Sequence, residues 1–301
     1  MVEGKIEVVI LKEDVLIKSR FPWLQAGVCF TIYLGILGAL YSAILWDLIL
    51  QWWDDPNYSH GFLVPLFSGL LVWQHRGVLG KLVPQGSWLG LAVLLGGLSE
   101  LVVGDLGAEL FLTRSSLLII IVGLILLHLG IEVLRVLAFP LVFLFFMVPL
   151  PTILFNAVAF PLQGLAAQNA TWMLDLLGVP VLRDGNVIHL SHISLGVAEA
   201  CSGIRSLISL LALAVAWAYL TLPGPWSMLV LVTSTVPITI VANAGRIVLT
   251  GLIGQWLGLE YAQGFFHTFS GWVIFLVAFL CLLGVHGIIR LVGSVHDRRI
   301  T

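Results

Sequence analysis

The chain has 301 residues, of which 59% are hydrophobic and only 10% charged, and its mean hydropathy is +1.08. Soluble domains carry about 25% charged residues, so the composition excludes a soluble globular protein and predicts an all-α polytopic membrane protein. A formal net charge of −2 without basic blocks gives no indication of nucleic-acid binding. The three cysteines form no CxxC pair and no disulfide framework.

Apolar stretches of about 20 residues cross a bilayer as helices. We expect about eight, over residues 23–46, 60–75, 87–104, 114–131, 135–150, 201–221, 226–248 and 267–290. The second and fifth are short and contain or end in proline. Residues 1–22 are expected to form a cytoplasmic segment before a retained first span, and the whole chain, 1–301, a single transmembrane domain.

The longest segment outside the predicted spans is an extracytoplasmic insertion over residues 152–200. Its first half predicts a helix broken near Pro161 that either lies in the membrane interface or re-enters the membrane. In its second half, Asp184-Gly185-Asn186 is a turn signal between β-prone runs. We therefore expect a small periplasmic hairpin before the helix that begins at residue 201.

Lysine and arginine set the orientation of such a chain, because cytoplasmic loops carry the excess of positive charge. With both termini in the cytoplasm, 10 of the 14 basic residues fall on the inner side. The resulting topology places residues 201, 246 and 267 at the outer ends of three different spans.

Cys201 is a candidate nucleophile at the predicted N-terminus of the sixth span, where unpaired N–H groups and the helix dipole favour a thiolate. Ser202 and Gly203 follow it, Ser202 as a possible helix cap. Arg205 is four residues on and is expected on the same helix face. The open alternative is an inert buried cysteine, as we expect for Cys29 and Cys281, which lie among apolar residues.

Asn243 and Arg246 stand three residues apart and share a helix face. Both are costly in an apolar helix unless they face a polar cavity, and arginine can hold a thiolate or an oxyanion. The alternative for Arg246 is an interfacial anchor. His267, in Gly264-Phe-Phe-His-Thr-Phe-Ser-Gly271, can take the thiol proton and then protonate a leaving amine.

In this order the motifs resemble those of the exosortases, multi-span bacterial relatives of the archaeosortases. The resemblance covers most of the chain. It rests on Trp52-Trp-Asp-Asp-Pro-Asn-Tyr58-Ser-His60-Gly61, Phe146-Met-Val-Pro-Leu-Pro151, Arg183-Asp-Gly-Asn186, Ala200-Cys-Ser-Gly-Ile-Arg-Ser206, Asn243-Ala-Gly-Arg246 and His267 with Gly271.

The resemblance implies a cysteine protease or transpeptidase of the bacterial inner membrane that processes proteins with a C-terminal PEP-CTERM tail and transfers them to an acceptor. Cys201 is then the nucleophile, and Arg246 and His267 are its partners. Tyr58 and His60 either line the substrate's approach or belong to an interfacial aromatic belt.

Other chemistry fits the residues less well. His189 and His192 point to opposite faces of a strand, no HExxH or CxxC is present, and we expect neither a metal nor a cofactor. A transporter predicts polar residues at mid-membrane depth and internal repeats, whereas here the polar residues collect at one face. A non-catalytic component of exopolysaccharide synthesis or export stays open, as do the acceptor and the oligomeric state.

Overall fold

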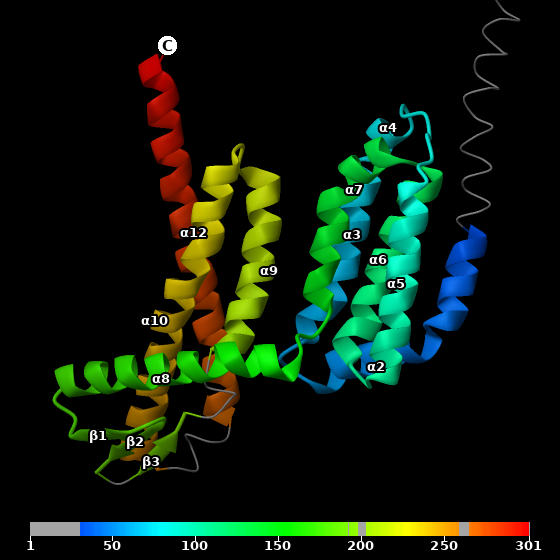
Figure 1. The fold of residues 1–301 in the computed structure, drawn as a ribbon. Coiled ribbons are helices and arrows are strands. Elements are labelled where there is room, and N and C mark those ends of the chain that lie inside the picture. Colours follow the sequence, from blue (N-terminus) through cyan, green and yellow to red (C-terminus); the bar gives the residue numbers. More distant parts are fainter. Residues whose placement is uncertain (1–30, 192, 198–202, 259–264, 301) are drawn as a thin grey trace, which may run out of the picture. The chain divides into compact units, whose positions relative to one another are not determined.

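The computed structural model describes residues 31–191, 193–197, 203–258 and 265–300. They are mostly helical, with one small sheet (Figure 1). The chain divides after Pro151 into two compact units.

The first unit is a helix bundle. Its elements are a helix over Thr31–Leu40, α2 (Ser42–Asp54), η1 (Ser59–Phe62), α3 (Leu63–Gln74), α4 (Arg76–Leu79), α5 (Leu89–Leu106), α6 (Leu110–His128), α7 (Ile131–Phe143) and η2 (Leu144–Met147). Helices α5 and α6 approach closely because α5 turns buried glycines toward α6 at every seventh position, Gly90, Gly97 and Gly104.

A polar hub at the start of α6 links the helices of this unit. The side chains of Arg114, Ser115 and Ser116 are all buried. Arg114 Nη1 donates to Gln51 on α2 at 2.6 Å, and Ser115 Oγ donates to Glu100 on α5 at 2.7 Å. Ser116 Oγ bonds the hydroxyl of Tyr41, just before α2, at 2.7 Å. These bonds allow α6 to carry the polar groups inside an apolar bundle, although Nε of Arg114 is buried without a hydrogen-bond partner among the described residues.

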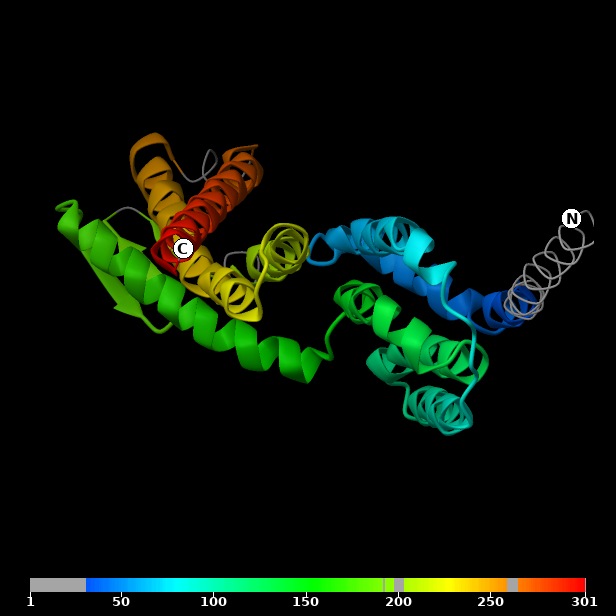
Figure 2. The ribbon, with the colours of Figure 1, turned by 90° about the horizontal axis from the view of Figure 1, so that it is seen from above.

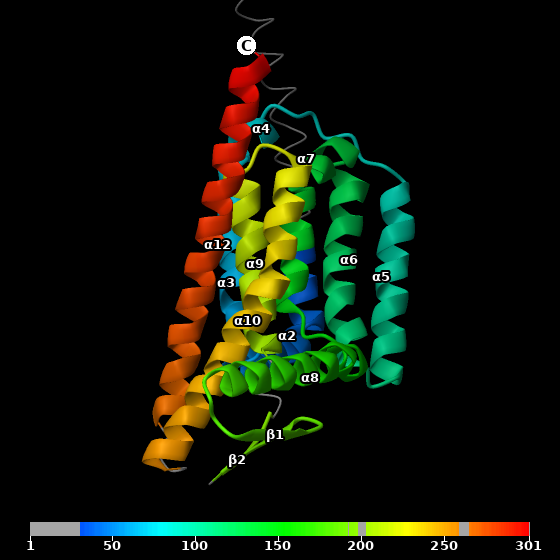
Figure 3. The same cartoon turned by 90° about the vertical axis from the view of Figure 1, so that its left-hand side faces the viewer.

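The second unit combines three long helices with a crosswise helix and a sheet. Its elements are α8 (Thr152–Leu176), β1 (Val181–Asp184), β2 (Val187–Leu190), β3 (Ser194–Gly196), α9 (Ile204–Thr221), α10 (Pro225–Leu257) and α12 (Phe265–Ile300). Helices α9, α10 and α12 stand side by side, and α8 lies across them (Figures 1 and 3). Seen from above, α8 shows its length while α9 is seen along its axis (Figure 2).

Strands β1 and β2 form the hairpin that the turn signal predicts, with Asp184 paired to Val187 across Gly185 and Asn186. Gly185 has a φ of +57°, which this tight turn favours. A third strand, β3, adds to β2 and was not expected from the sequence. The sheet packs on α8 and α10 through a core that includes Ala170 and Ile188.

We predict eight spans. Among the residues that the structure describes, five helices are long and apolar enough to cross a membrane, or up to seven if each bent pair of helices counts as one span. The five are α5, α6, α9, α10 and α12. The first predicted span is bent by 71° between Leu40 and Ser42, and the second and fifth correspond to the short helices α3 and α7. The chain is thus a multi-pass membrane protein, while the number eight and the orientation of the termini stay predictions.

Two local expectations were wrong. Helix α8 is not broken near Pro161 but continues through it. Proline has no N–H to donate to the carbonyl of Ala157, four residues earlier, and because both residues are exposed this carbonyl is not enclosed by protein. Cys281 is exposed rather than buried. It lies within the apolar stretch Phe269–Val292 of α12, where an exposed position faces lipid and suits a small apolar side chain. Cys29 lies outside the described residues.

Candidate functional site

Helix α10 carries a buried polar face. Thr235, Thr239, Asn243 and Arg246 follow one another at helical spacing, and at most 9% of each residue is exposed. The two members that the sequence analysis singled out, Asn243 and Arg246, thus lie together inside the second unit. The two threonines were missed, although their spacing of four residues from each other and from Asn243 is the signal that reveals them.

The Asn243 end of this face contacts the start of α9. A Cβ atom added to Gly203, which precedes α9, would lie 3.1 Å from Cγ and 3.2 Å from Nδ2 of Asn243. Gly203 is buried and has a φ of +79°, in the left-handed region that favours glycine. Both the backbone conformation and the close asparagine side chain therefore favour glycine at this position.

The Arg246 end of the same face contacts α12. A Cβ atom on Gly271 would lie 3.9 Å from Nη1 of Arg246. Gly271 is four residues after His267 in α12, so the two share a helix face one turn apart, about 6 Å along the axis. One polar face of α10 thereby reaches both neighbouring helices within the second unit.

Three of the predicted site residues lie wholly or partly outside the described residues. Cys201 and Ser202 lie outside the described residues, and His267 belongs to α12 with its side chain outside them. Their placement beside Arg246 is therefore a prediction that rests on their neighbours in the chain.

The start of α9 differs from the expectation. The helix begins at Ile204 rather than at residue 201, and Gly203 is its N-cap. A φ of +79° at Gly203 lies outside helical geometry, so the helix that carries Arg205 does not extend through Gly203, and the shared face with Cys201 stays a prediction. Arg205 lies in the first turn of α9 and is partly buried.

The C-terminal end of α10 also extends further than predicted. The helix continues to Leu257, so Arg246 lies eleven residues before its end rather than at the end. The added turns are covered by the sheet: a Cβ on Gly251 would lie 3.2 Å from Cδ1 of both Leu190 and Leu195. Arg246 is therefore enclosed by protein on this helix, which weighs against a simple interfacial anchor.

In the first unit, His60 belongs to a contact between two sequence motifs, the one that starts at Trp52 and the one that starts at Phe146. Trp52 Nε1 donates to the carbonyl oxygen of Met147 at 2.9 Å, and Nε2 of His60 lies 3.2 Å from the carbonyl oxygen of Phe146. A carbonyl only accepts, so Nε2 of His60 carries the proton. Tyr58 is buried. The motif that starts at Trp52 thus holds η2 in place.

His60 lies in η1, outside the five candidate spans. Burial lowers its pKa below the ordinary value, against smaller opposing contributions from its backbone hydrogen bonds. The imidazole is thus held neutral near pH 7. Within the described part of the chain, no three His, Cys, Asp or Glu residues lie close enough to hold a metal ion.

Comparison with protein families gives one finding. The model of the transmembrane exosortases (Exosortase_EpsH) matches residues 52–284, which include Cys201, Arg246 and His267. Comparison with curated proteins and with solved structures gives no match. The match covers most of both units, and the chain therefore belongs to the transmembrane exosortase family.

Proposed function

We propose that this exosortase is a cysteine protease and transpeptidase that cleaves the C-terminal PEP-CTERM sorting signals of exported proteins and transfers them to an acceptor. Members of the family are in general membrane transpeptidases. In this proposal Cys201 is the nucleophile, Arg246 binds the oxyanion and His267 transfers the proton. Asn243, Gly203, Ser202 and Arg205 shape the site around them.

One observation supports this proposal most. The buried polar face of α10 contacts Gly203 through Asn243 and Gly271 through Arg246. Gly203 follows Cys201 by two residues, which span at most about 7 Å, and Gly271 follows His267 by one helical turn. In this proposal the thiol of Cys201, the guanidinium of Arg246 and the imidazole of His267 meet at this face, and the contacts of Gly203 and Gly271 with it support that arrangement.

The first half of the proposed reaction forms a thioester. The Cys201 thiolate attacks the carbonyl carbon of the scissile peptide bond, and the carbonyl oxygen becomes an oxyanion. The Arg246 guanidinium, a permanent cation with five donors, stabilises that charge. The C–N bond then breaks, and the leaving amine takes its proton from His267.

The second half resolves the thioester. His267, now neutral, accepts a proton from the incoming nucleophile, which attacks the thioester carbon and releases the Cys201 thiolate. Water gives hydrolysis, and an amine, glycan or lipid acceptor gives transfer. The same residues serve both outcomes, so the site's chemistry does not select the acceptor.

The proposed setting is the bacterial inner membrane with the site facing the periplasm. The support is the distribution of basic residues, 10 of 14 of which fall on the cytoplasmic side in the predicted topology. The partner is a membrane-anchored protein whose apolar tail helix lies in the bilayer beside the second unit. Its basic end stays in the cytoplasm, which leaves the scissile bond outside.

Cleavage of a tagged PEP-CTERM substrate in cells tests this proposal. Cys201→Ala and Cys201→Ser are expected to abolish processing while the protein still inserts into the membrane, and Cys281→Ser is the matched control because Cys281 is exposed on α12. Mass spectrometry of the new C-terminus distinguishes a free acid from an acceptor adduct. Normal processing by Cys201→Ala would refute the nucleophile and favour a non-catalytic role in exopolysaccharide synthesis or export.

A further inference from the structure

Helix α8 exposes an apolar stripe along its whole length. The stripe consists of Leu154, Val158, Leu165, Trp172 and Leu176, whose spacings of four and seven residues place them on one helix face. Each is between 43% and 66% exposed. Pro161 and Gln168 are exposed on the same face, which is otherwise apolar. A largely apolar exposed surface of this kind marks a contact with a partner or with lipid.

The chemistry of the helix favours lipid over water. No charged residue occurs from Thr152 to Leu174, and Asp175 is the first. The helix uses a different face to hold the sheet, through Ala166, Ala170 and Leu174. The stripe is therefore an additional surface that the fold of the second unit leaves uncovered.

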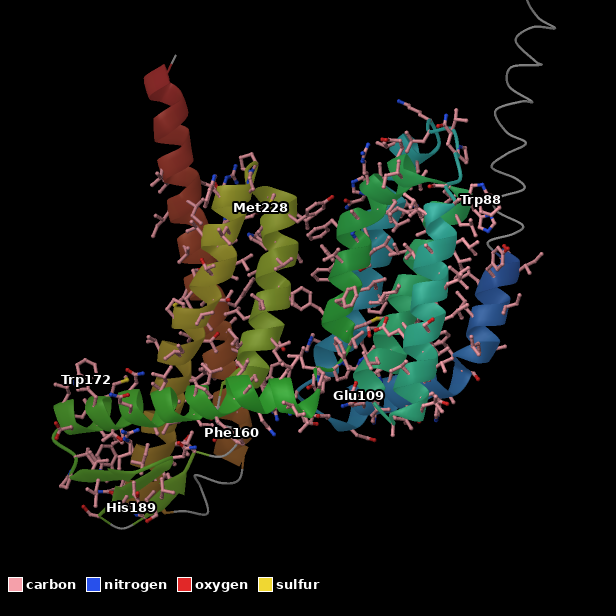
Figure 4. The ribbon with its side chains drawn as sticks, viewed as in Figure 1. Trp88, Glu109, Phe160, Trp172, His189 and Met228 are labelled. Atoms are coloured by element: carbon pink, nitrogen blue, oxygen red, sulfur yellow. The ribbon has the colours of Figure 1, made fainter. Side chains whose placement is uncertain are left out.

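The orientation of α8 indicates where the stripe lies. Helices α9, α10 and α12 contain candidate spans, and α8 runs crosswise to them (Figures 1 and 3). Trp172 points to the side of α8 on which these helices rise, whereas His189 of β2 lies on the opposite side (Figure 4). With the spans upright in a bilayer, the stripe faces the lipid and the sheet faces water.

We infer that α8 is an in-plane membrane helix whose stripe binds the lipid at the boundary between headgroups and acyl chains. The surface continues the lipid-facing surface of the spans beside it. Interfacial helices place their apolar face about 5–10 Å into this boundary. The 22 residue steps from Leu154 to Leu176 cover about 33 Å. All of this length is expected at one depth in the bilayer, whereas the depth of a re-entrant segment would change along it.

The position of α8 also sets the depth of the candidate site, a step that rests on the proposed function. Helix α8 packs against Ile247 and Val248 of α10, directly after Arg246. An α8 held at headgroup level holds Arg246 at the same level. The bond that the enzyme cleaves is then the one where a substrate's tail helix leaves the bilayer.

Spin labels at single cysteines test the inference in the full-length chain. The background carries Cys29→Ser, Cys201→Ala and Cys281→Ser. The labelled variants are Leu154→Cys, Leu165→Cys and Leu176→Cys, and the control is Leu182→Cys, which is 68% exposed on β1. The protein is reconstituted in vesicles of phosphatidylethanolamine and phosphatidylglycerol, and collisions of each label with oxygen and with a water-soluble nickel chelate are measured.

The three α8 labels are expected to collide with oxygen, to collide several-fold less with the chelate than the control does, and to share one depth. Chelate collisions equal to those at the control would overturn the inference, because the stripe would then face water. Low collision with both reagents, which indicates a covering protein, would overturn it too, as would a depth that changes along α8. The background lacks Cys201, so the result is independent of whether Cys201 is the nucleophile.

Discussion

Substitution of Gly203 by alanine separates two constraints at the start of α9. A residue with a Cβ at a φ of +79° costs about 1–2 kcal/mol. The new methyl group would also stand 3.1 Å from Cγ of Asn243, and overpacking of this kind costs about 1–3 kcal/mol. Gly203→Ala is therefore expected to destabilise the second unit by roughly the sum of these two contributions.

Gly178→Ala is the matched control, because Gly178 has a similar φ of +73° but nothing within 4 Å of its Cβ position. Thermal unfolding of the purified chain should show a larger fall in Tm for Gly203→Ala than for Gly178→Ala. Adding Asn243→Ala should recover the difference, which a double-mutant cycle measures. Equal losses in the two glycine variants, with no coupling to Asn243, would show that the asparagine does not press on Gly203.

Three further substitutions have expected outcomes. The pKa of His60 is lower in the folded chain than in the unfolded one, so the unfolded chain binds more protons and the Tm should fall as the pH is lowered below about 6.5. His60→Gln, which keeps a hydrogen-bond donor, should weaken this pH dependence, and an unchanged pH profile of the Tm would contradict the prediction. Gly97→Ala places a Cβ 2.7 Å from Cγ1 of Ile120 and should destabilise the first unit by about 1–3 kcal/mol. Gly96 has open space at its Cβ position, so the control Gly96→Ala should be neutral or stabilising by up to about 1 kcal/mol. A greater loss of stability in Gly96→Ala than in Gly97→Ala would refute the close packing of α5 on α6. His286 has a buried Nε2 with no hydrogen-bond partner among the described residues, and its ring packs edge-on to the indole of Trp217. Removal of this unsatisfied nitrogen by His286→Phe should raise the Tm and leave activity unchanged, and a lower Tm would contradict the prediction.

The long helices were predictable because apolar composition over about 20 residues is a local property of the sequence. Helices α5, α6 and α9 begin within four residues of the expected positions. The hairpin was predictable for the same reason, since Gly185 and Asn186 specify a two-residue turn. The third strand was not, because β3 depends on pairing with β2 rather than on its own residues.

The ends of the helices near the site depend on tertiary contacts that no local pattern contains. Helix α10 continues to Leu257 because the sheet covers its added turns at Gly251. Helix α9 starts late because Gly203 takes a left-handed conformation against Asn243. The sequence identified Asn243 and Arg246 as an unusual polar pair, but only the fold reveals that this pair contacts two other helices.

The bend before α2 has a similar origin. Gly38 is only a weak local signal for a bend, whereas the side chain of Tyr41 is fully buried and its hydroxyl bonds Ser116, 75 residues away. Polar groups inside a membrane bundle must find partners, and here the partner lies on another helix. A contact of this range is outside the reach of a window along the chain.

In the proposed reaction the substrate acylates the sulfur of Cys201 beside Arg246 and His267. Chemical trapping of this acyl group is the most direct test of the proposed function. Hydroxylamine added to the full-length enzyme during turnover should intercept a thioester and release the substrate as a C-terminal hydroxamate, detected by mass spectrometry. The wild-type enzyme should give the hydroxamate, and Cys201→Ala should give none. Substrate processing without any hydroxamate, or a hydroxamate formed equally by Cys201→Ala, would contradict the account.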